Sequence, residues 1–195
     1  MSQRILLAIA VALGLLVIGL GLFWNPGQPE TTVSPRGGDF TLQSADGPVS
    51  LSAFRGKVVL LYFGYTYCPD ICPTSLVRTA AALNLLKPEE ASRVVTLLVS
   101  VDPERDTLAH LKEYVTFFHP GMVGLTSSQA EVAAVAKQYG AFYAKHQTGS
   151  AAGYVVDHTA DVYLIGTDGV LKERLPHVAT PEQMVAAIRE RLSVQ

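Results

Sequence analysis

The stretch that decides the fold is YFGYTYCPDICP, residues 62–73. It overlaps the end of a run of apolar and aromatic residues, Val58–Phe63, which is typical of a strand buried on both faces of a sheet. It also leads into a helix that we predict from Pro73 to Leu86. Because proline disfavours helical geometry in the residue before it, we expect Pro73 to be the first helical residue and Cys72 to be its cap. The two cysteines are therefore expected between a buried strand and the start of a helix.

Outside this stretch, apolar runs alternate with helical patterns along the chain. Further strands are expected at residues 40–42, 49–51, 94–101, 162–165 and 171–175, and further helices at residues 107–118, 128–139 and 181–192. Helices between buried strands, followed by a hairpin and a last helix, indicate an α/β domain. We therefore predict a mixed central sheet flanked by helices, and the thioredoxin-like arrangement is the candidate fold.

The position of the cysteine pair favours ionised sulfur. The unpaired N–H groups and aligned peptide dipoles of a helix N-terminus stabilise negative charge, so at least one thiol should ionise more readily than a free cysteine. Three residues separate Cys68 from Cys72, one more than in a Cys-x-x-Cys redox motif. Such a loop can close as a disulfide, or it can hold two thiolates around an ion. Two thiolates are too few for a closed zinc site but suit Cu(I), which accepts two or three ligands.

A third copper ligand would come from one of the five histidines of the chain. His110 and His119 belong to a predicted helix, and His146 and His177 lie in polar segments, so we expect all four at the surface or as caps. His158 instead comes just before the strand that should run beside the cysteine-bearing strand. Thioredoxins carry at this place a cis-proline that touches their cysteine pair. A neutral imidazole there is expected to complete a Cys2His site.

The composition limits the possible classes of protein. With 195 residues, 49% of them apolar, the chain can bury the core of one domain but scarcely of two. The formal net charge of −2 argues against a basic surface for phosphate groups, so we expect no nucleic-acid partner. Two cysteines are too few for a multi-bridge disulfide scaffold. A single disulfide that ties a surface loop stays as the structural alternative to a metal site.

The N-terminal region predicts a membrane anchor. Residues Ile5–Phe23 carry no charged or amide side chain, and Arg4 and Trp24 flank them. A helix of this length, at about 1.5 Å per residue, covers the roughly 30 Å hydrocarbon core of a bilayer. The bulky residues at positions 22–24 stand where a signal-peptide cleavage site would need small ones, so we favour an uncleaved anchor. The positive-inside tendency keeps Arg4 cytoplasmic.

Three segments follow from this pattern. Residues 1–25 are expected to form a cytoplasmic tip and a transmembrane anchor. Residues 26–38, rich in proline and glycine, are expected to form a flexible linker. Residues 39–195 would then be a thioredoxin-like copper-binding domain outside the cytoplasm.

Three sequence blocks together resemble the Sco/SenC family. They are the cysteine block CPDICP at 68–73, the block DPERDT at 102–107 and the block DHT at 157–159, in this order behind one apolar N-terminal segment. The resemblance covers residues 39–195. It implies a membrane-tethered, thioredoxin-like copper protein that helps to assemble the dinuclear copper centre of cytochrome c oxidase. By position, Cys68, Cys72 and His158 would be its copper ligands.

The DPERDT block has two interpretations. Without the family, it predicts the end of a strand followed by a capped helix start, with Asp106 or Thr107 as the cap. The alternative is that this block contributes to the surface on which a partner protein docks.

The leading hypothesis is a metallochaperone rather than an enzyme. It would bind Cu(I), with Cu(II) as a second candidate, and pass it to the copper-accepting subunit of cytochrome c oxidase. Other copper chaperones or thiol reductants are further candidate partners. The expected location is the inner membrane, crossed once, with the C-terminal domain in the periplasm. The alternative is a thiol-disulfide oxidoreductase that reduces the cysteines of the target copper site, using the redox-capable pair Cys68 and Cys72.

Overall fold

The structure is a computed structural model that describes residues 3–5, 7, 12–14, 16, 37–149 and 153–193. The chain divides into two units, residues 1–34 and 35–195, and the folded domain belongs to the second. The described residues of the first unit are helical. Most of the expected anchor, Ile5–Phe23, and most of the expected linker, 26–38, lie outside the described residues. In the part of the chain that is described, no helix is long and apolar enough to cross a membrane.

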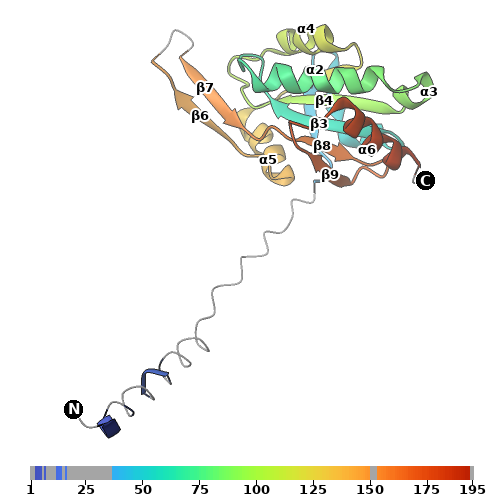
Figure 1. Ribbon diagram of the computed structural model, residues 1–195. Coiled ribbons are helices and arrows are strands. Elements are labelled where there is room, and N and C mark those ends of the chain that lie inside the picture. Colours follow the sequence, from blue (N-terminus) through green and yellow to red (C-terminus); the bar gives the residue numbers. More distant parts are fainter. Residues whose placement is uncertain are drawn as a thin grey trace. The chain divides into compact units, whose positions relative to one another are not determined.

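A five-stranded mixed sheet forms the centre of the domain (Figure 1). Its strand order is β5-β4-β3-β8-β9; β3, β4 and β5 run parallel, whereas β8 and β9 run antiparallel to their neighbours. This confirms the predicted mixed sheet. The bounds are Val58–Gly64 for β3, Val94–Ser100 for β4, Met122–Leu125 for β5, Val162–Ile165 for β8 and Leu171–Leu175 for β9.

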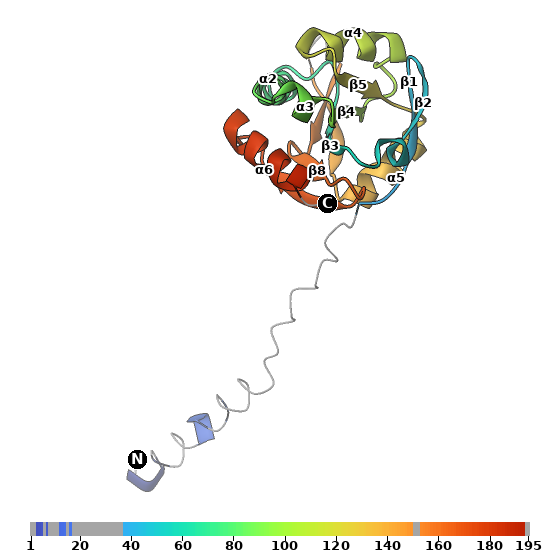
Figure 2. The same ribbon diagram turned by 90° about the vertical axis from the view of Figure 1, so that its right-hand side faces the viewer.

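Helices cover both faces of this sheet (Figure 2). α2 and α6 lie on one face, α5 lies on the other, and α4 packs along β5. Since successive side chains of a strand point to opposite faces, Phe63 of β3 meets Tyr139 of α5, while Tyr62 faces Cys72 of α2. The bounds are Ile71–Asn84 for α2, Pro88–Ala91 for α3, Leu108–Phe118 for α4, Gln129–Tyr139 for α5 and Pro181–Ser193 for α6.

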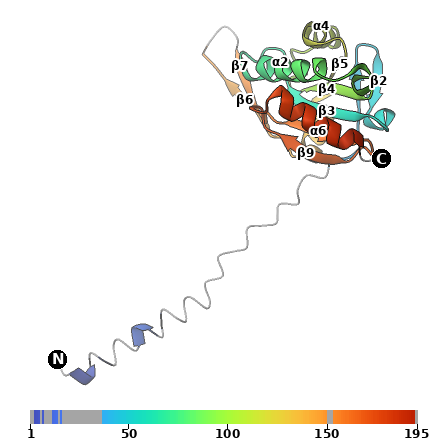
Figure 3. The ribbon, with the colours of Figure 1, turned by 45° about the vertical axis from the view of Figure 1, so that its right-hand side comes forward.

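Two hairpins and a short helix complete the domain. β1 (Thr41–Ser44) pairs antiparallel with β2 (Gly47–Ser50), and the 3-10 helix η1 (Leu51–Phe54) follows them. β6 (Tyr143–Gln147) pairs with β7 (Tyr154–His158) in a separate two-stranded sheet. This second hairpin reaches away from the rest of the domain (Figure 3). It carries His158 as its last residue.

The start of α2 differs from the prediction. The helix begins at Ile71, after Asp70 in the cap position, so Cys72 lies inside the first turn and is not the cap. Pro73 is accommodated because N–H groups of the first turn have no partner within the helix, and a missing one there costs nothing. The consequence is that Cys72 turns inward and is fully buried.

Candidate metal centre

Three separate elements bring the sequence-predicted site residues together. Cys68 lies in the loop between β3 and α2, Cys72 in the first turn of α2, and His158 at the end of β7. Their sulfur and imidazole ligand atoms all lie within 4.8 Å of one another. Both cysteines are free thiols, so the structure does not show the tied loop of the disulfide alternative. Among the described residues this is the only group of three or more histidine, cysteine or acidic side chains placed to hold an ion.

Hydrogen bonds orient the three side chains. Cys72 Sγ lies 3.1 Å from His158 Nε2, and the Cys72 amide donates to Cys68 Sγ at 3.4 Å. On its other side, His158 Nδ1 lies 3.1 Å from the carbonyl oxygen of Thr159. When Nδ1 carries the proton and donates it to that carbonyl, Nε2 keeps its lone pair on the side of the sulfurs. The carbonyl oxygen of Thr159 is thus placed to accept the Nδ1 proton in the tautomer that a metal at Nε2 requires.

The two thiols differ in acidity. The pKa of Cys68 is lowered to about 3, chiefly because its sulfur accepts a hydrogen bond from Cys72, with smaller contributions from His158 and from the N–H groups at the helix start. The pKa of Cys72 is raised, first because it is buried and then because it lies beside the Cys68 charge. Without metal, the pair therefore consists of one thiolate, Cys68, and one thiol, Cys72.

Aromatic rings enclose the imidazole. The rings of Tyr62 and Tyr65 meet the His158 ring edge-on, with centroids 5.9 and 5.8 Å away. Tyr65 also accepts a hydrogen bond from the Val156 amide at 3.1 Å, which ties the loop before Cys68 to β7. These contacts limit the rotation of the imidazole.

Gly64, the last residue of β3, makes room for the buried sulfur. A Cβ at this position would lie 2.9 Å from Cys72 Sγ and 2.8 Å from Cε1 of Tyr62, closer than real contacts allow. The close approach of strand and sulfur therefore requires glycine here.

Asp106 of the DPERDT block forms hydrogen bonds that support the loop before Cys68. The carboxylate of Asp106 accepts hydrogen bonds from the Thr66 amide at 3.1 Å, the Thr66 hydroxyl at 2.6 Å and the Ser100 hydroxyl at 2.5 Å. Thr107 is the cap of α4, because its hydroxyl accepts from the His110 amide. Of the two residues that the sequence offered as cap, Asp106 has this other role. The sequence could not show it, since its partner Thr66 lies 40 residues away.

The other four histidines lie outside the group. His110 contacts the ring of Tyr67, His119 accepts from the Gly121 amide, His146 pairs with Asp157, and the carbonyl of His177 accepts from Arg78.

The group of Cys68, Cys72 and His158 opens into a pocket of about 390 Å³ between the cysteine loop and β7. Cys68 and His158 both line it, so solvent and a partner can reach them, whereas Cys72 stays covered.

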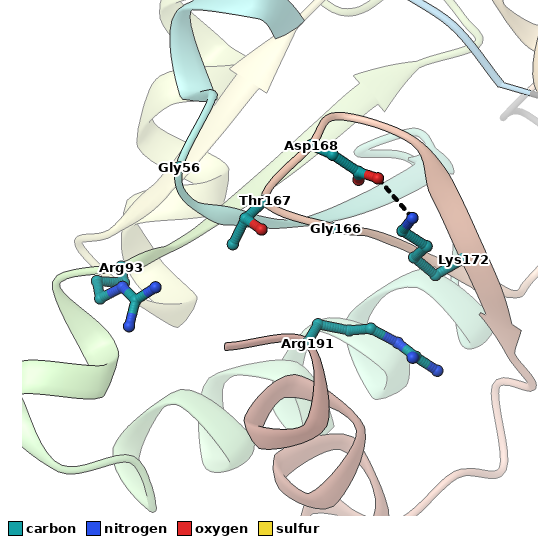
Figure 4. Close-up of a pocket in the computed structure, with 7 residues that line it drawn as sticks. All are labelled: Gly56, Arg93, Gly166, Thr167, Asp168, Lys172 and Arg191. Atoms are coloured by element: carbon teal, nitrogen blue, oxygen red, sulfur yellow. Dashed lines mark hydrogen bonds and ion pairs between the residues drawn. The ribbon is translucent and has the colours of Figure 1, made fainter. Parts of the chain in front are cut away.

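A larger pocket of about 500 Å³ lies at the opposite end of β3 (Figure 4). Arg93, Lys172 and Arg191 contribute cationic side chains to it, and Lys172 pairs with Asp168 at 2.6 Å. Because its lining residues include neither sulfur nor imidazole, this pocket does not offer a copper site.

The chain is similar to known proteins over most of its length. The SCO1/SenC family model matches residues 28–193. A "Protein SCO2 homolog, mitochondrial" of Bos taurus is 38% identical over 158 residues, which cover 80% of this chain and 59% of that protein. The chain spans between 49% and 62% of the length of the curated relatives it matches first.

Two solved structures are informative. The crystal structure of Arabidopsis thaliana ScoI with copper bound matches with a TM-score of 0.74 at 36% identity and covers 80% of this chain and 97% of that one. BsSco, described as a member of the Sco family of cytochrome c oxidase assembly proteins, matches with a TM-score of 0.67 at 26% identity and covers 87% and 100%. These similarities confirm the α/β thioredoxin-like fold.

Proposed function

This chain belongs to the SCO1/SenC family, and we propose that it is a copper metallochaperone for the assembly of the dinuclear copper centre of cytochrome c oxidase. The observation that carries the proposal is the group of two sulfurs and one imidazole nitrogen within 4.8 Å. Copper is then the cargo of the protein, and Cys68, Cys72 and His158 are its ligands. A related structure with copper bound supports the same cargo.

The donor set fits this cargo. Sulfur is a soft ligand that suits Cu(I), and the imidazole adds a nitrogen that Cu(II) also accepts. Three ligands leave the ion open to an incoming ligand of the acceptor, which allows transfer by ligand exchange. Since the pKa of Cys72 is raised, this thiol must give up its proton when copper is loaded.

We propose that the acceptor is the copper-accepting subunit of cytochrome c oxidase and that the domain meets it from a membrane tether. In this arrangement Ile5–Phe23 cross the inner membrane once and residues 39–195 lie in the periplasm. The length of the apolar run and the position of Arg4 support it. A tether confines both proteins to one plane and raises their effective concentration without a tight interface. Protease added to spheroplasts should degrade the domain, and protection would contradict this topology.

A thiol-disulfide oxidoreductase is the second candidate, because the two thiols divide the required roles. Cys68 is half-buried, lines the pocket and has a lowered pKa, as an attacking thiolate needs. Cys72 is buried beside it and could resolve a mixed disulfide.

The experiment that tests the proposed function is metal analysis of the reduced and the oxidised protein. The reduced protein should hold one copper per chain and should lose it when Cys68 and Cys72 are joined as a disulfide, because only the thiolate is a strong ligand. Full copper content after oxidation would place the site elsewhere. An absence of copper from the reduced protein would leave the oxidoreductase as the better account.

A further inference from the structure

The strand that carries His158 has no backbone pairing with the central sheet. This strand, β7, pairs with β6 in a separate two-stranded sheet, and this hairpin reaches away from the rest of the domain (Figure 3). The strand ladder therefore does not fix the imidazole relative to the sulfurs. Side-chain contacts do so: the ring of Tyr62 on β3 meets the imidazole, the Tyr65 hydroxyl accepts from the Val156 amide, and further contacts hold the start of β7.

Arg105 holds the other end of β7 in two ways. Its guanidinium carbon lies 3.7 Å from the centroid of the Tyr154 ring, a close cation-π contact. Its Nη1 donates a hydrogen bond to the carbonyl oxygen of the same residue at 3.0 Å. Arg105 thus contacts both the ring and the backbone of Tyr154.

A buried carboxylate locks this pair. Asp102, 1% exposed, accepts a hydrogen bond from the Tyr154 hydroxyl at 2.7 Å and forms an ion pair with Arg105 Nε. Arg105, Asp102 and Tyr154 therefore form a closed ring of contacts. The ion pair of Asp102 and Arg105 keeps its geometry because both side chains are largely shielded from water.

Arg105 also reaches the cysteine loop. Its guanidinium lies 4.9 Å from the ring centroid of Tyr67, the residue before Cys68, and 5.6 Å from that of Tyr65. The side chain thus lies between the loop that presents the sulfurs and the strand that presents the imidazole.

We infer that Arg105 is a positioning residue for the metal centre: together with the Tyr65 contact it holds β7 against the cysteine loop, and so it contributes to the distance between His158 and the two sulfurs. This inference rests on the proposed copper site. It also gives the DPERDT block a role other than partner docking. The side chain of Arg105 is only 18% exposed and its charge already faces Asp102, which makes it a poor contact for an incoming protein.

The two copper states respond differently to a loosened imidazole. Cu(I) is stable between two sulfurs alone, whereas Cu(II) requires nitrogen and more ligands. Loss of Arg105 should therefore weaken Cu(II) binding selectively. A general loss of folding would weaken the binding of Cu(I) and of Cu(II) together.

The test measures Cu(I) affinity, Cu(II) affinity and the Cu(II)-thiolate absorption of the full chain. In Arg105→Ala we expect Cu(II) affinity to fall by about tenfold or more, as for other groups that orient metal ligands. Cu(I) affinity should change by less than about threefold, since both sulfurs remain. Tyr154→Phe keeps the ring under the guanidinium but loses the hydrogen bond to Asp102, so its effect should be smaller.

Arg189→Ala is the matched control. It removes an arginine that forms two hydrogen bonds with Glu90, at 2.9 and 3.0 Å, away from the site. Its copper binding should equal that of the wild type.

An unchanged Cu(II) affinity and spectrum in folded Arg105→Ala would overturn the inference. If this variant does not fold, Arg105→Lys decides in its place, because lysine keeps the charge and the stem but not the planar stacking. Selective Cu(II) loss in Arg105→Lys supports the inference, and wild-type Cu(II) binding overturns it. A wild-type protein that binds no copper would refute the proposed function instead.

Discussion

Removal of the Asp106 carboxylate should destabilise the domain and loosen the cysteine loop. The three hydrogen bonds that this group accepts come from two donors of Thr66 and one of Ser100. A hydrogen bond to a charged group contributes about 1.5 to 3 kcal/mol, so three of them at the low end give about 4.5 kcal/mol. Thr66 is partly exposed and its donors can rehydrate, whereas Ser100 is fully buried. We therefore expect Asp106→Ala to lower the free energy of unfolding by about 3 kcal/mol.

The measurement is urea denaturation followed by circular dichroism. Asp106→Asn should lower the free energy of unfolding by less, about 1 to 2 kcal/mol, because its amide oxygen still accepts hydrogen bonds. A loss remains because its NH2 group faces a hydrogen-bond donor where the carboxylate had a second oxygen. Asp46→Ala is the control, since this carboxylate forms an ion pair with Lys112 at 2.6 Å but is 73% exposed. An exposed pair contributes about 1 kcal/mol or less. If Asp106→Ala costs no more than Asp46→Ala, the support assigned to Asp106 is wrong.

Three further predictions concern the ligands. The His158→Ala variant should still bind Cu(I) and retain its disulfide-exchange rate, but it should lose the Cu(II)-thiolate absorption. If His158→Ala binds Cu(II) as the wild type does, His158 is not a ligand. The rate at which iodoacetamide alkylates Cys68 should change little between about pH 5 and pH 8, because a thiol with a pKa of about 3 is ionised throughout this range. The rate for an ordinary thiol would rise roughly several hundredfold over the same range. A tenfold rise in rate per pH unit would show that Cys68 has an ordinary pKa. Cu(I) binding should release one proton near pH 7, since the raised pKa keeps Cys72 protonated, so affinity should rise about tenfold per pH unit; a pH-independent affinity would contradict this.

The sequence predicts best those elements whose apolar pattern is bounded by turn residues. The strands β8 and β9 have the predicted bounds, 162–165 and 171–175, because a Thr-Asp-Gly turn separates two short runs. α4 begins after Thr107, one of the two predicted caps. In these cases local chemistry alone decides the structure.

The sequence does not predict the elements that depend on tertiary contacts. β6 has the sequence YAKHQ and is mostly exposed, so it shows no apolar alternation. It exists because it pairs with β7. β5, MVGL, is short and contains a glycine whose missing side chain lets Leu111 of α4 approach closely. Neither reason can be read from a local pattern.

The candidate site divides in the same way. The spacing of Cys68 and Cys72 is visible in the sequence, and His158 could be singled out by its place before a predicted strand. The groups that hold them are not visible. Asp106 is 40 residues from Thr66, and Arg105 is 49 residues from Tyr154, so only the fold brings them together.

X-ray absorption spectroscopy of the copper-loaded protein tests the central claim most directly. With one Cu(I) per reduced chain, we predict a first shell of two sulfurs and one imidazole nitrogen, and the nitrogen should disappear in His158→Ala. A first shell that retains the imidazole in His158→Ala, or that contains fewer than two sulfurs in the wild type, would contradict copper binding by Cys68, Cys72 and His158.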